Sequence, residues 1–567
     1  MPFEKKVSNL LSASTPSAKN MFVQEAMKAS HKTTSGNGAL KYSTSGNDFV
    51  DDFASIAKYK EPRSYEEVAK TMQLLYSIDK TKAVKMAIFI RLITRKSQVM
   101  KDKGVETLEE VQRGQGLKNE GIMRMLWLAI NHPNSFKANL PLFIAAGSWK
   151  DIITMMNLDL QYHGWDGRQL DWGFLRGVLQ AGLINPNTTH LVRKYLPTIR
   201  TTSKCKTLES QADTIIGRWF ARSMFPDRDN AQSYKQYRKL KSEGTAHSWQ
   251  QLISKQLYDR INFDRIAGRA LALLVGSKFL QNHNLVEKYS KWIEGKPTAK
   301  FTGFVFELFK PLGNGYRLNH IEPYKESTIN AQFAQLVKTG KEGVNTNSGL
   351  LVVRDTSCSM TSQAVGCSMS SYDVAKSMAL YFSEFLTGPF ANSFAEFADT
   401  CKLRQWQGRT PVDKYINDRC EAYGGTNFQS VIDLFIRMKN QGVPEKDFPT
   451  GILCVSDGEF DRRRTNTSTN FQTAIRKLRN AGFSKEYVDN FKIILWDIPN
   501  SYYGKSETKF EDFADAPNFF YLSGYDPSSV AFIMEGKECK VTPRNAAELM
   551  ETALDQELLN RVFIPRK

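Results

Sequence analysis

Three short stretches in the second half of the sequence carry oxygen-bearing side chains where a strand is expected to end. The first is DTSCSM (355–360), which follows the apolar run GLLVV (349–353) directly. It places Asp355, Ser357 and Ser359 at alternate positions. An ionised carboxylate at the end of a buried strand is costly unless a cation or several N–H donors meet it. The pattern therefore indicates a positively charged partner for Asp355.

Two further stretches supply side chains of the same kind. GGTNF (424–428) carries Thr426, and VSDGEFD (455–461) ends a second expected strand at Asp457. Because ligands of parallel sheets bind beyond the carboxyl ends of the strands, we expect these loops to meet at one sheet edge. An all-oxygen set suits Mg²⁺ or another hard divalent cation, which is bound at about 2.1 Å and keeps several waters. The predicted metal ligands are Asp355, Ser357, Ser359, Thr426 and Asp457.

The elements around these stretches alternate between two patterns from about residue 346 onward. Short apolar runs such as GLLVVRD, GILCVSD and FKIILWD are separated by amphipathic segments such as YDVAKSMALYFSEFL and NFQSVIDLFIRMKN. This alternation is typical of a parallel sheet wound with helices. We expect a doubly wound α/β domain over residues 346–540, followed by a C-terminal helix and tail over 541–567.

The first half shows helical spacing of apolar residues instead. SYEEVAKTMQLLYSI (64–78), KAVKMAIFIRLI (82–93) and NEGIMRMLWLAI (119–130) repeat them every three or four positions. Successive helices with short connections predict an α-solenoid of stacked helix pairs over residues 46–345, although no strict repeat is visible. Residues 1–45 are rich in Ser, Thr, Lys and Gly, so we expect a mobile or extended N-terminal arm.

Positive charge is concentrated in the helical half. The chain has 77 Lys and Arg against 59 Asp and Glu; residues 346–567 hold 26 and 28 of these, which leaves 51 and 31 for residues 1–345. Such an excess attracts polyanions, nucleic acid above all. Lys-rich helices that only keep a long helical domain in solution explain it equally well. Candidate phosphate contacts, each also explained as part of a solvated face, are Lys150, Arg193, Lys194, Arg238, Lys239 and Lys241.

Composition argues against several other classes of protein. The seven cysteines are odd in number and form no CxxC pair, which disfavours a disulfide framework and a structural zinc site. All seven histidines precede residue 346, so the second half has no histidine for a catalytic triad of its own. No run approaches the roughly 18 to 20 apolar residues of a membrane span. We expect a cytoplasmic protein.

The motifs resemble two known families. DxSxS after an apolar strand, Thr426 in a Gly-Gly-Thr loop and Asp457 in SDGEFD resemble the metal-ion-dependent adhesion site (MIDAS) of von Willebrand factor A domains. GSWKDIITMMNL (147–158), VRKYLPTIR (192–200) and YKQYRKLKSEG (234–244) are similar to the TROVE module of the Ro ribonucleoprotein autoantigens. SGNGALKYSTSGNDFVDDF and YLSGYDPSSVAFIMEGK are closer still to a related uncharacterised conserved-domain family with the same two-part layout.

The resemblance implies a ring of HEAT-like helical repeats closed by the von Willebrand domain. It further implies binding of small noncoding or misfolded RNA on the basic ring, with single-stranded ends entering the central hole. An exoribonuclease, or an acidic protein ligand at the metal site, is the implied protein partner. The sequence departs from the Ro pattern at Trp149, where the Ro proteins carry a histidine, but it retains Lys150. We expect a monomer outside any larger assembly.

Three functions compete at this point. The leading one is a non-enzymatic RNA-binding protein with a magnesium-loaded von Willebrand domain. The alternative is a protein-interaction or structural assembly module that binds no RNA and uses the metal to capture an acidic group of a partner. A metal-dependent hydrolase or nuclease is disfavoured, because phosphoryl-transfer centres usually gather more carboxylates around two metals.

Overall fold

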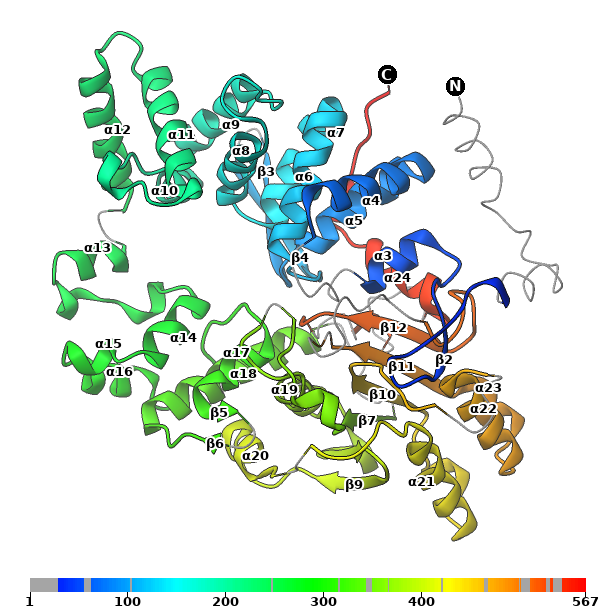
Figure 1. Ribbon diagram of the computed structural model, residues 1–567. Coiled ribbons are helices and arrows are strands. Elements are labelled where there is room, and N and C mark those ends of the chain that lie inside the picture. Colours follow the sequence, from blue (N-terminus) through cyan, green and yellow to red (C-terminus); the bar gives the residue numbers. More distant parts are fainter. Residues whose placement is uncertain are drawn as a thin grey trace, which may run out of the picture.

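The chain folds into a helical body followed by a six-stranded α/β domain (Figure 1). The computed structural model describes residues 29–55, 63–101, 104–245, 248–314, 317–342, 349–365, 367–419, 422–462, 468–498, 500, 510–526, 531–533 and 543–566. The predicted fold class, an α-solenoid followed by a doubly wound α/β domain, is confirmed. None of the described helices is long and apolar enough to cross a membrane.

The helical body consists of two runs of helices. The first comprises α3 (Asp48–Ser55), α4 (Tyr65–Ile78), α5 (Lys80–Arg91), α6 (Lys118–Asn131), α7 (Pro133–Ala146), α8 (Trp149–His163), α9 (Trp172–Ile184), α10 (Thr189–Tyr195), α11 (Leu208–Met224) and α12 (Asn230–Thr245). The second comprises α13 (Trp249–Ser254), α14 (Gly268–Gly276), α15 (Phe279–Asn282), α16 (Val286–Ile293), α17 (Val305–Phe309) and α18 (Pro323–Lys341). Helices that follow one another along the chain pack as neighbours, as in α4 with α5 and α11 with α12.

Polar side chains fix where several helices begin. Ser64 and Glu67 form a capping box at the start of α4, in which each side chain bonds the backbone N–H of the other residue. The α4 helix ends at Asp79, whose carboxylate accepts a bond from the N–H of Lys82 and so caps α5. One residue therefore both ends a helix and starts the next, and this sharp junction makes α4 and α5 a packed pair.

A β-hairpin that the helical pattern did not predict interrupts the first run. Strands β3 (Arg95–Lys101) and β4 (Gly104–Gln112) pair antiparallel, and β3 packs on α7. A second short hairpin, β5 (Gly313–Asn314) and β6 (Arg317–Leu318), lies before α18. The solenoid is thus an irregular one.

The sheet follows a doubly wound order, β12-β11-β10-β7-β8-β9. Its strands are β7 (Leu350–Asp355), β8 (Ser393–Phe397), β9 (Cys401–Gln405), β10 (Gly451–Ser456), β11 (Lys492–Asp497) and β12 (Phe519–Ser523), and only β9 runs antiparallel to its neighbour. The helices of this domain are α19 (Ser371–Ser383), α20 (Pro411–Asn417), α21 (Gln429–Asn440), α22 (Asn470–Asn480), α23 (Lys485–Asn490) and α24 (Ala546–Leu554). The chain leaves β7 toward β8 on one side and later fills the other side from β10, so the order reverses between β7 and β10.

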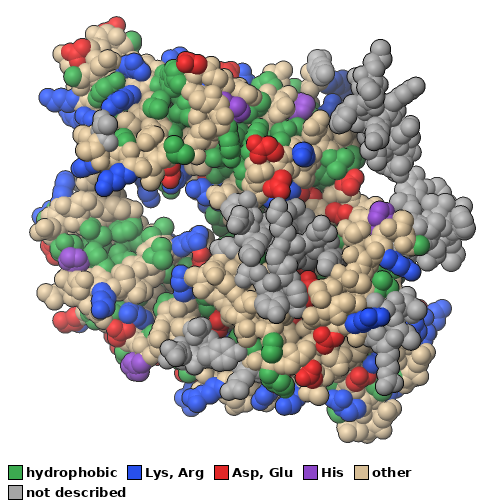
Figure 2. All heavy atoms as spheres, in the orientation of Figure 1, with side chains coloured by type: hydrophobic (Ala, Val, Ile, Leu, Met, Phe, Trp, Pro, Cys, Tyr) green, Lys and Arg blue, Asp and Glu red, His purple; other side chains and the backbone are tan. Residues whose placement is uncertain are grey.

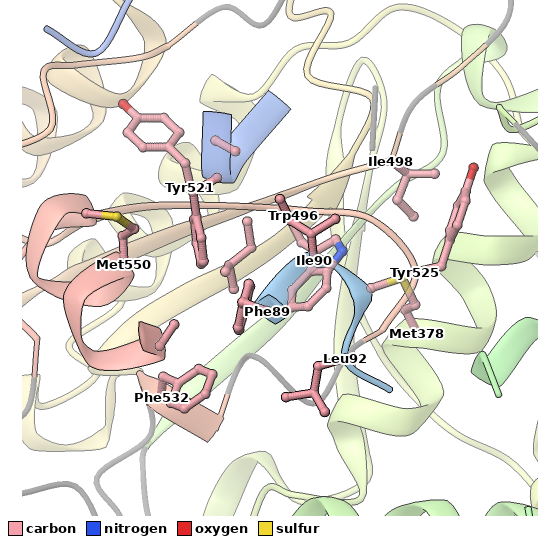
Figure 3. Packing of buried hydrophobic residues seen from close by; sticks show 14 of the residues in the cluster. Phe89, Ile90, Leu92, Met378, Trp496, Ile498, Tyr521, Tyr525, Phe532 and Met550 are labelled. Carbon is pink, nitrogen blue, oxygen red and sulfur yellow. The ribbon is translucent and has the colours of Figure 1, made fainter. Parts of the chain in front are cut away.

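The two parts share one hydrophobic core. Phe89 and Ile90 of α5, with Leu92 just after it, are fully buried, and they belong to the same cluster as Trp496 of β11 and Tyr521 of β12. Figure 3 shows these side chains together, with Met550 of α24 at their side. The separately predicted domains are therefore joined by continuous apolar packing. A second, smaller core lies within residues 261–331.

Both ends of the described chain cross from one part to the other. The hairpin of β1 (Lys32–Thr34) and β2 (Leu40–Tyr42) packs on the sheet domain, where Tyr42 pairs with Phe510. Of the expected mobile or extended arm, residues 1–28 lie outside the described residues, and residues 32–45 are extended but docked, because Ala39, Leu40 and Tyr42 are buried. At the other end α24 contacts α3, α5 and β12, and Phe563 bonds Asn139 of α7.

A buried ionic network ties α3 to α6. The guanidinium of Arg124 is fully buried and donates to both carboxylate oxygens of Asp52, at 2.6 and 2.7 Å, and to Glu120 at 2.9 Å. Arg63 donates to the same Glu120 carboxylate. Because every charge in the group has a partner, removal of one member leaves another charge buried alone.

We expect Asp52→Ala to lower the free energy of unfolding by about 3–5 kcal/mol, the usual effect of breaking one side of a buried ion pair. Urea unfolding followed by circular dichroism measures the change. Asp48→Ala, on the same helix but exposed, is the matched control. Equal losses in the two variants would show that the network does not stabilise the fold.

Candidate metal centre

The two predicted carboxylates lie at the point where the strand order reverses. Asp355 is the last residue of β7, and Asp457 directly follows β10, the adjacent strand. Such switch points are where open α/β sheets bind their ligands. Both side chains are buried, and the hydroxyl of Ser456 donates to Asp355 Oδ2 across the two strands. Ser456 was not identified from the sequence, although it immediately precedes Asp457.

The loop after β7 folds back over the end of the strand. The backbone N–H of Ser357 donates to Asp355 Oδ1 at 2.8 Å, and the hydroxyls of Ser357 and Ser359 lie 3.2 Å apart. The Ser359 side chain lies close enough to Asp457 to lower the pKa of that carboxyl, against the larger effect of burial. Asn500 bonds both Ser359 and Asp457, since its Nδ2 donates to Asp457 Oδ2 at 2.8 Å and to the carbonyl of Ser359 at 2.7 Å. The DxSxS loop and the SDGEFD loop are therefore held together.

The third loop joins the same edge through backbone bonds. Tyr423 N donates to the carbonyl of Thr356 at 2.9 Å, and Cys358 N donates to that of Gly424 at 3.3 Å. Thr426 is held by Asp461 on both sides, with its N–H on Asp461 Oδ2 at 2.7 Å and its carbonyl accepting from Asp461 N at 3.1 Å. All five predicted ligands thus come from three loops that hydrogen-bond to one another.

A glycine is required in that third loop. Gly424 has φ +73°, and a Cβ there would lie 2.3 Å from Asp399 Oδ2. Asp399, just beyond β8, accepts a hydrogen bond from Gly425 N at 2.9 Å and so holds the loop in place. Asp399 and Asn500 lie outside the motifs, and Asp461 ends SDGEFD without having been assigned a role. They support the loops rather than fill the motif.

Burial disfavours the ionised form of both carboxylates in the absence of a cation. Loss of solvent raises the pKa of Asp355 above its usual range, and bonds from Ser456 and Ser357 offset this only in part. Burial also raises the pKa of Asp457, and the nearby charge of Asp355 raises it further. Two ionised carboxylates in a buried site are mutually repulsive until a cation lies between them.

The donor set fits a hard divalent cation only if hydroxyls complete it. Among the residues that the structure describes, no group of three or more His, Cys, Asp or Glu side chains could hold a metal. Two carboxylates with Ser357, Ser359 and Thr426 give an all-oxygen set of the kind that Mg²⁺ accepts. Binding of the metal stays a prediction.

The predicted phosphate contacts fall on three helices of the first run. Lys150 is exposed at the start of α8, Arg193 and Lys194 lie in the last turn of α10, and Arg238 and Lys239 are exposed on α12. The α10 helix packs on both α8 and α12. These five residues therefore lie on three helices that pack together.

Lys241 has a structural role that the sequence pattern did not reveal. Its ammonium group donates to the carbonyl of Leu196 and to Thr198 Oγ1 at 2.8 Å, so it ties α12 to the segment after α10. Burial lowers the pKa of Lys241 to about 8. This role comes in addition to the predicted phosphate contact at Lys241, which stays a prediction like the other five.

A cluster of cations around the start of α8 was missed. Arg91 pairs with Asp151 at 2.8 Å, and Arg95 donates to the carbonyls of Ala145 and Gly147. Burial, with the positive charge of Lys150 as the next cause, lowers the pKa of Lys118 at the start of α6. The spread of these residues over 60 positions hides the cluster from any local pattern.

Comparisons with known proteins bear on the two parts unequally. A domain of unknown function (DUF7788) matches residues 350–561, the sheet domain with its C-terminal helix. Among solved structures, the crystal structure of the Deinococcus radiodurans Ro (RSR) protein is similar with a TM-score of 0.42 and 10% identity, over 85% of this chain and 99% of that chain. No curated protein matches the sequence.

We expect Mg²⁺ to raise the melting temperature of the protein and Asp355→Asn to abolish that rise. At 100 times its Kd a bound ion stabilises the folded state by about 2.7 kcal/mol. Without metal the variant should be at least as stable as the wild type, because the amide removes a carboxylate that burial disfavours. Thermal melts with Mg²⁺ and with EDTA measure both effects.

Asp489→Asn serves as the control for that experiment. It makes the same change on α23, at the edge of the sheet where the strands begin, and removes only an exposed ion pair. A magnesium response in Asp355→Asn equal to that of Asp489→Asn would place the metal elsewhere.

Proposed function

We propose that this protein is a non-catalytic RNA-binding protein whose helical body contacts RNA phosphates and whose sheet domain binds Mg²⁺ to capture an acidic group of a protein partner. The observation that carries the RNA part is the charge of the body, 51 basic against 31 acidic residues before residue 346. Phosphate contacts dominate the affinity of such proteins. The motif resemblance to the TROVE module supports the same assignment.

The arrangement of the cations fits RNA better than a scattered basic surface would. Lys118 and Lys150 lie close to each other at the starts of α6 and α8, beside the buried Arg91. Figure 2 shows the molecule open between the two runs of helices, with Lys and Arg side chains along the margin. Lys and Arg side chains on the outer surface and at the margin of the opening could therefore contact RNA phosphates.

A cavity of about 500 Å³ lies where the two helical runs meet the sheet domain. Its lining combines cations with the half-buried ring of Phe304 and with two carboxylates: Arg95, Lys96, Arg269, Lys300, Phe304, Glu342 and Asp526. Proteins that bind single-stranded nucleic acid use rings that stack on bases and cations that follow the backbone, and Phe304 with the four cations could play these parts. We propose that the free end of a small structured or misfolded RNA enters here.

The metal centre supplies the protein-binding part of the proposal. The hydroxyls of Ser357, Ser359 and Thr426 add no negative charge, so an Mg²⁺ held by them with Asp355 and Asp457 could take a further carboxylate from outside. The partner is therefore a protein with an exposed acidic side chain, for which an RNA-degrading enzyme is the candidate that the resemblance implies. We assign no catalytic step to this chain, since phosphoryl transfer usually employs a larger set of carboxylates around two metals.

We expect RNA to copurify with the protein at low salt and to be released as salt is raised. The ratio of absorbance at 260 and 280 nm and sequencing of the bound nucleic acid measure this. The logarithm of the binding constant should fall linearly with that of the salt concentration, by about 0.7–0.9 for each phosphate contact. An RNA-free preparation that also fails to shift structured RNA would contradict the proposal.

We further expect the double variant Lys118→Ala/Lys150→Ala to weaken RNA binding and to reduce the salt slope by about 1 to 2, because two phosphate contacts are lost. Filter binding at several salt concentrations measures the slope. Lys485→Ala, an exposed lysine on α23 of the sheet domain, is the control and should bind as the wild type does. Equal slopes in all three proteins would place the phosphate contacts away from α6 and α8.

A further inference from the structure

The segment that follows Asp457 connects two of the three loops of the metal centre. It runs from Gly458 to Asp461, and Asp461 bonds both the N–H and the carbonyl of Thr426. Its path therefore fixes where Asp457 and Thr426 lie relative to each other. The residues that hold this segment are found at the other end of the chain.

The turn of the N-terminal hairpin binds the segment residue by residue. Ser35 Oγ donates to the carbonyl of Phe460 at 2.7 Å, and Asn37 Nδ2 donates to that of Glu459 at 2.7 Å. The Asn37 side chain also bonds the carboxyl group of Asp461. The backbone carbonyl of Asn37 accepts a bond from Arg462 N at 3.0 Å.

The hairpin also contributes backbone contacts. Gly36 N donates to the carboxylate of Glu459, and Gly38 forms a β-bridge with Asp461. Residues 459 to 462 are thus each bound by the hairpin turn. Side chains from more than 420 positions earlier in the sequence form one wall of the metal-site loop.

Lys41 of β2 holds the start of the same segment. Its side chain is 2% exposed, and its ammonium group donates to the carbonyl of Gly458, the residue after Asp457. It pairs with the fully buried Glu511 at 3.2 Å and lies 4.7 Å from the ring centre of Phe460. A buried, paired cation of this kind keeps its neighbours in place, because moving it would leave Glu511 unpaired.

We propose that residues 35–41 are a positioning element of the metal centre, holding segment 458–462 in the path that brings Asp457 and Thr426 to Asp355. This inference rests on the metal site of the proposed function. It adds a thermodynamic linkage. If docking of the hairpin raises the affinity for Mg²⁺ by some factor, bound Mg²⁺ must favour docking of the hairpin by the same factor. Supporting residues of metal sites typically change affinity about 10- to 100-fold when they are removed.

The hairpin carries this linkage to the helical body. Tyr42 pairs with Phe510, and Ser45 accepts from Ala514 N at 2.8 Å through its carbonyl. Both the N–H and the hydroxyl of Ser45 bond Asp51, in the first turn of α3. Metal binding in the sheet domain is therefore connected to the first helix of the body by a chain of direct contacts.

The test is a Mg²⁺ titration of the full chain, read as the shift in melting temperature. Asn37→Ala removes side-chain bonds to Glu459 and Asp461 on a half-buried turn, and we expect it to raise the half-saturating Mg²⁺ concentration about tenfold. Asn490→Ala is the matched control: it loses one side-chain bond to a backbone carbonyl, on α23 at the opposite edge of the sheet. It should titrate as the wild type does.

The double variant Lys41→Met/Glu511→Gln tests the buried contact without leaving a charge alone, and we expect it to weaken Mg²⁺ binding as well. Hydrogen exchange provides a readout that needs no substitution, since Mg²⁺ should slow exchange of the amides in residues 36–42 of the wild type. If Asn37→Ala responds to Mg²⁺ as the wild type does, and Mg²⁺ does not slow exchange of the hairpin amides, the role of the hairpin is overturned and the metal site stands. Absence of any response in the wild type would overturn the metal site, and the inference with it.

Discussion

The structure depends on the packing of α5 against the sheet domain. Phe89, Ile90 and Leu92 are fully buried in a core that they share with Trp496 and Tyr521. Burial of large apolar side chains is the dominant favourable term in folding, and here it joins parts that a composition-based boundary would separate. The helical body and the sheet are consequently fixed relative to each other at this junction, and the ionic network of Arg124 and Asp52 anchors α3 beside it.

The candidate metal centre is held together by residues that lie outside its motif. Asp355 and Asp457 are placed by the strand order, but their loops are held by Ser456, Asn500 and Asp461. The same bonds hold the loops that carry the hydroxyls of Ser357, Ser359 and Thr426. A motif of five residues therefore describes the contents of the site, and the surrounding hydrogen bonds determine its geometry.

Much of the fold and the candidate ligands could be predicted from the sequence because both leave local patterns. Apolar spacing marked α4, α5 and α6, and buried strands such as GLLVV and GILCV marked the switch point at which Asp355 and Asp457 lie. The hairpin of β3 and β4 was missed because its strands are polar and exposed on much of their surface. The supporting residues and the role of Lys241 were missed because they depend on contacts between distant segments, which leave no periodicity.

The separation in sequence between the N-terminal hairpin and its binding site has a consequence for biosynthesis. Ser35 bonds Phe460, 425 residues later, and Tyr42 pairs with Phe510. The hairpin therefore leaves the ribosome long before Phe460 and Phe510, which it contacts, are synthesised. Contacts of such long sequence separation form slowly, and exposed apolar strands are prone to aggregate meanwhile. The nascent chain thus has to carry an undocked hairpin through most of its own translation.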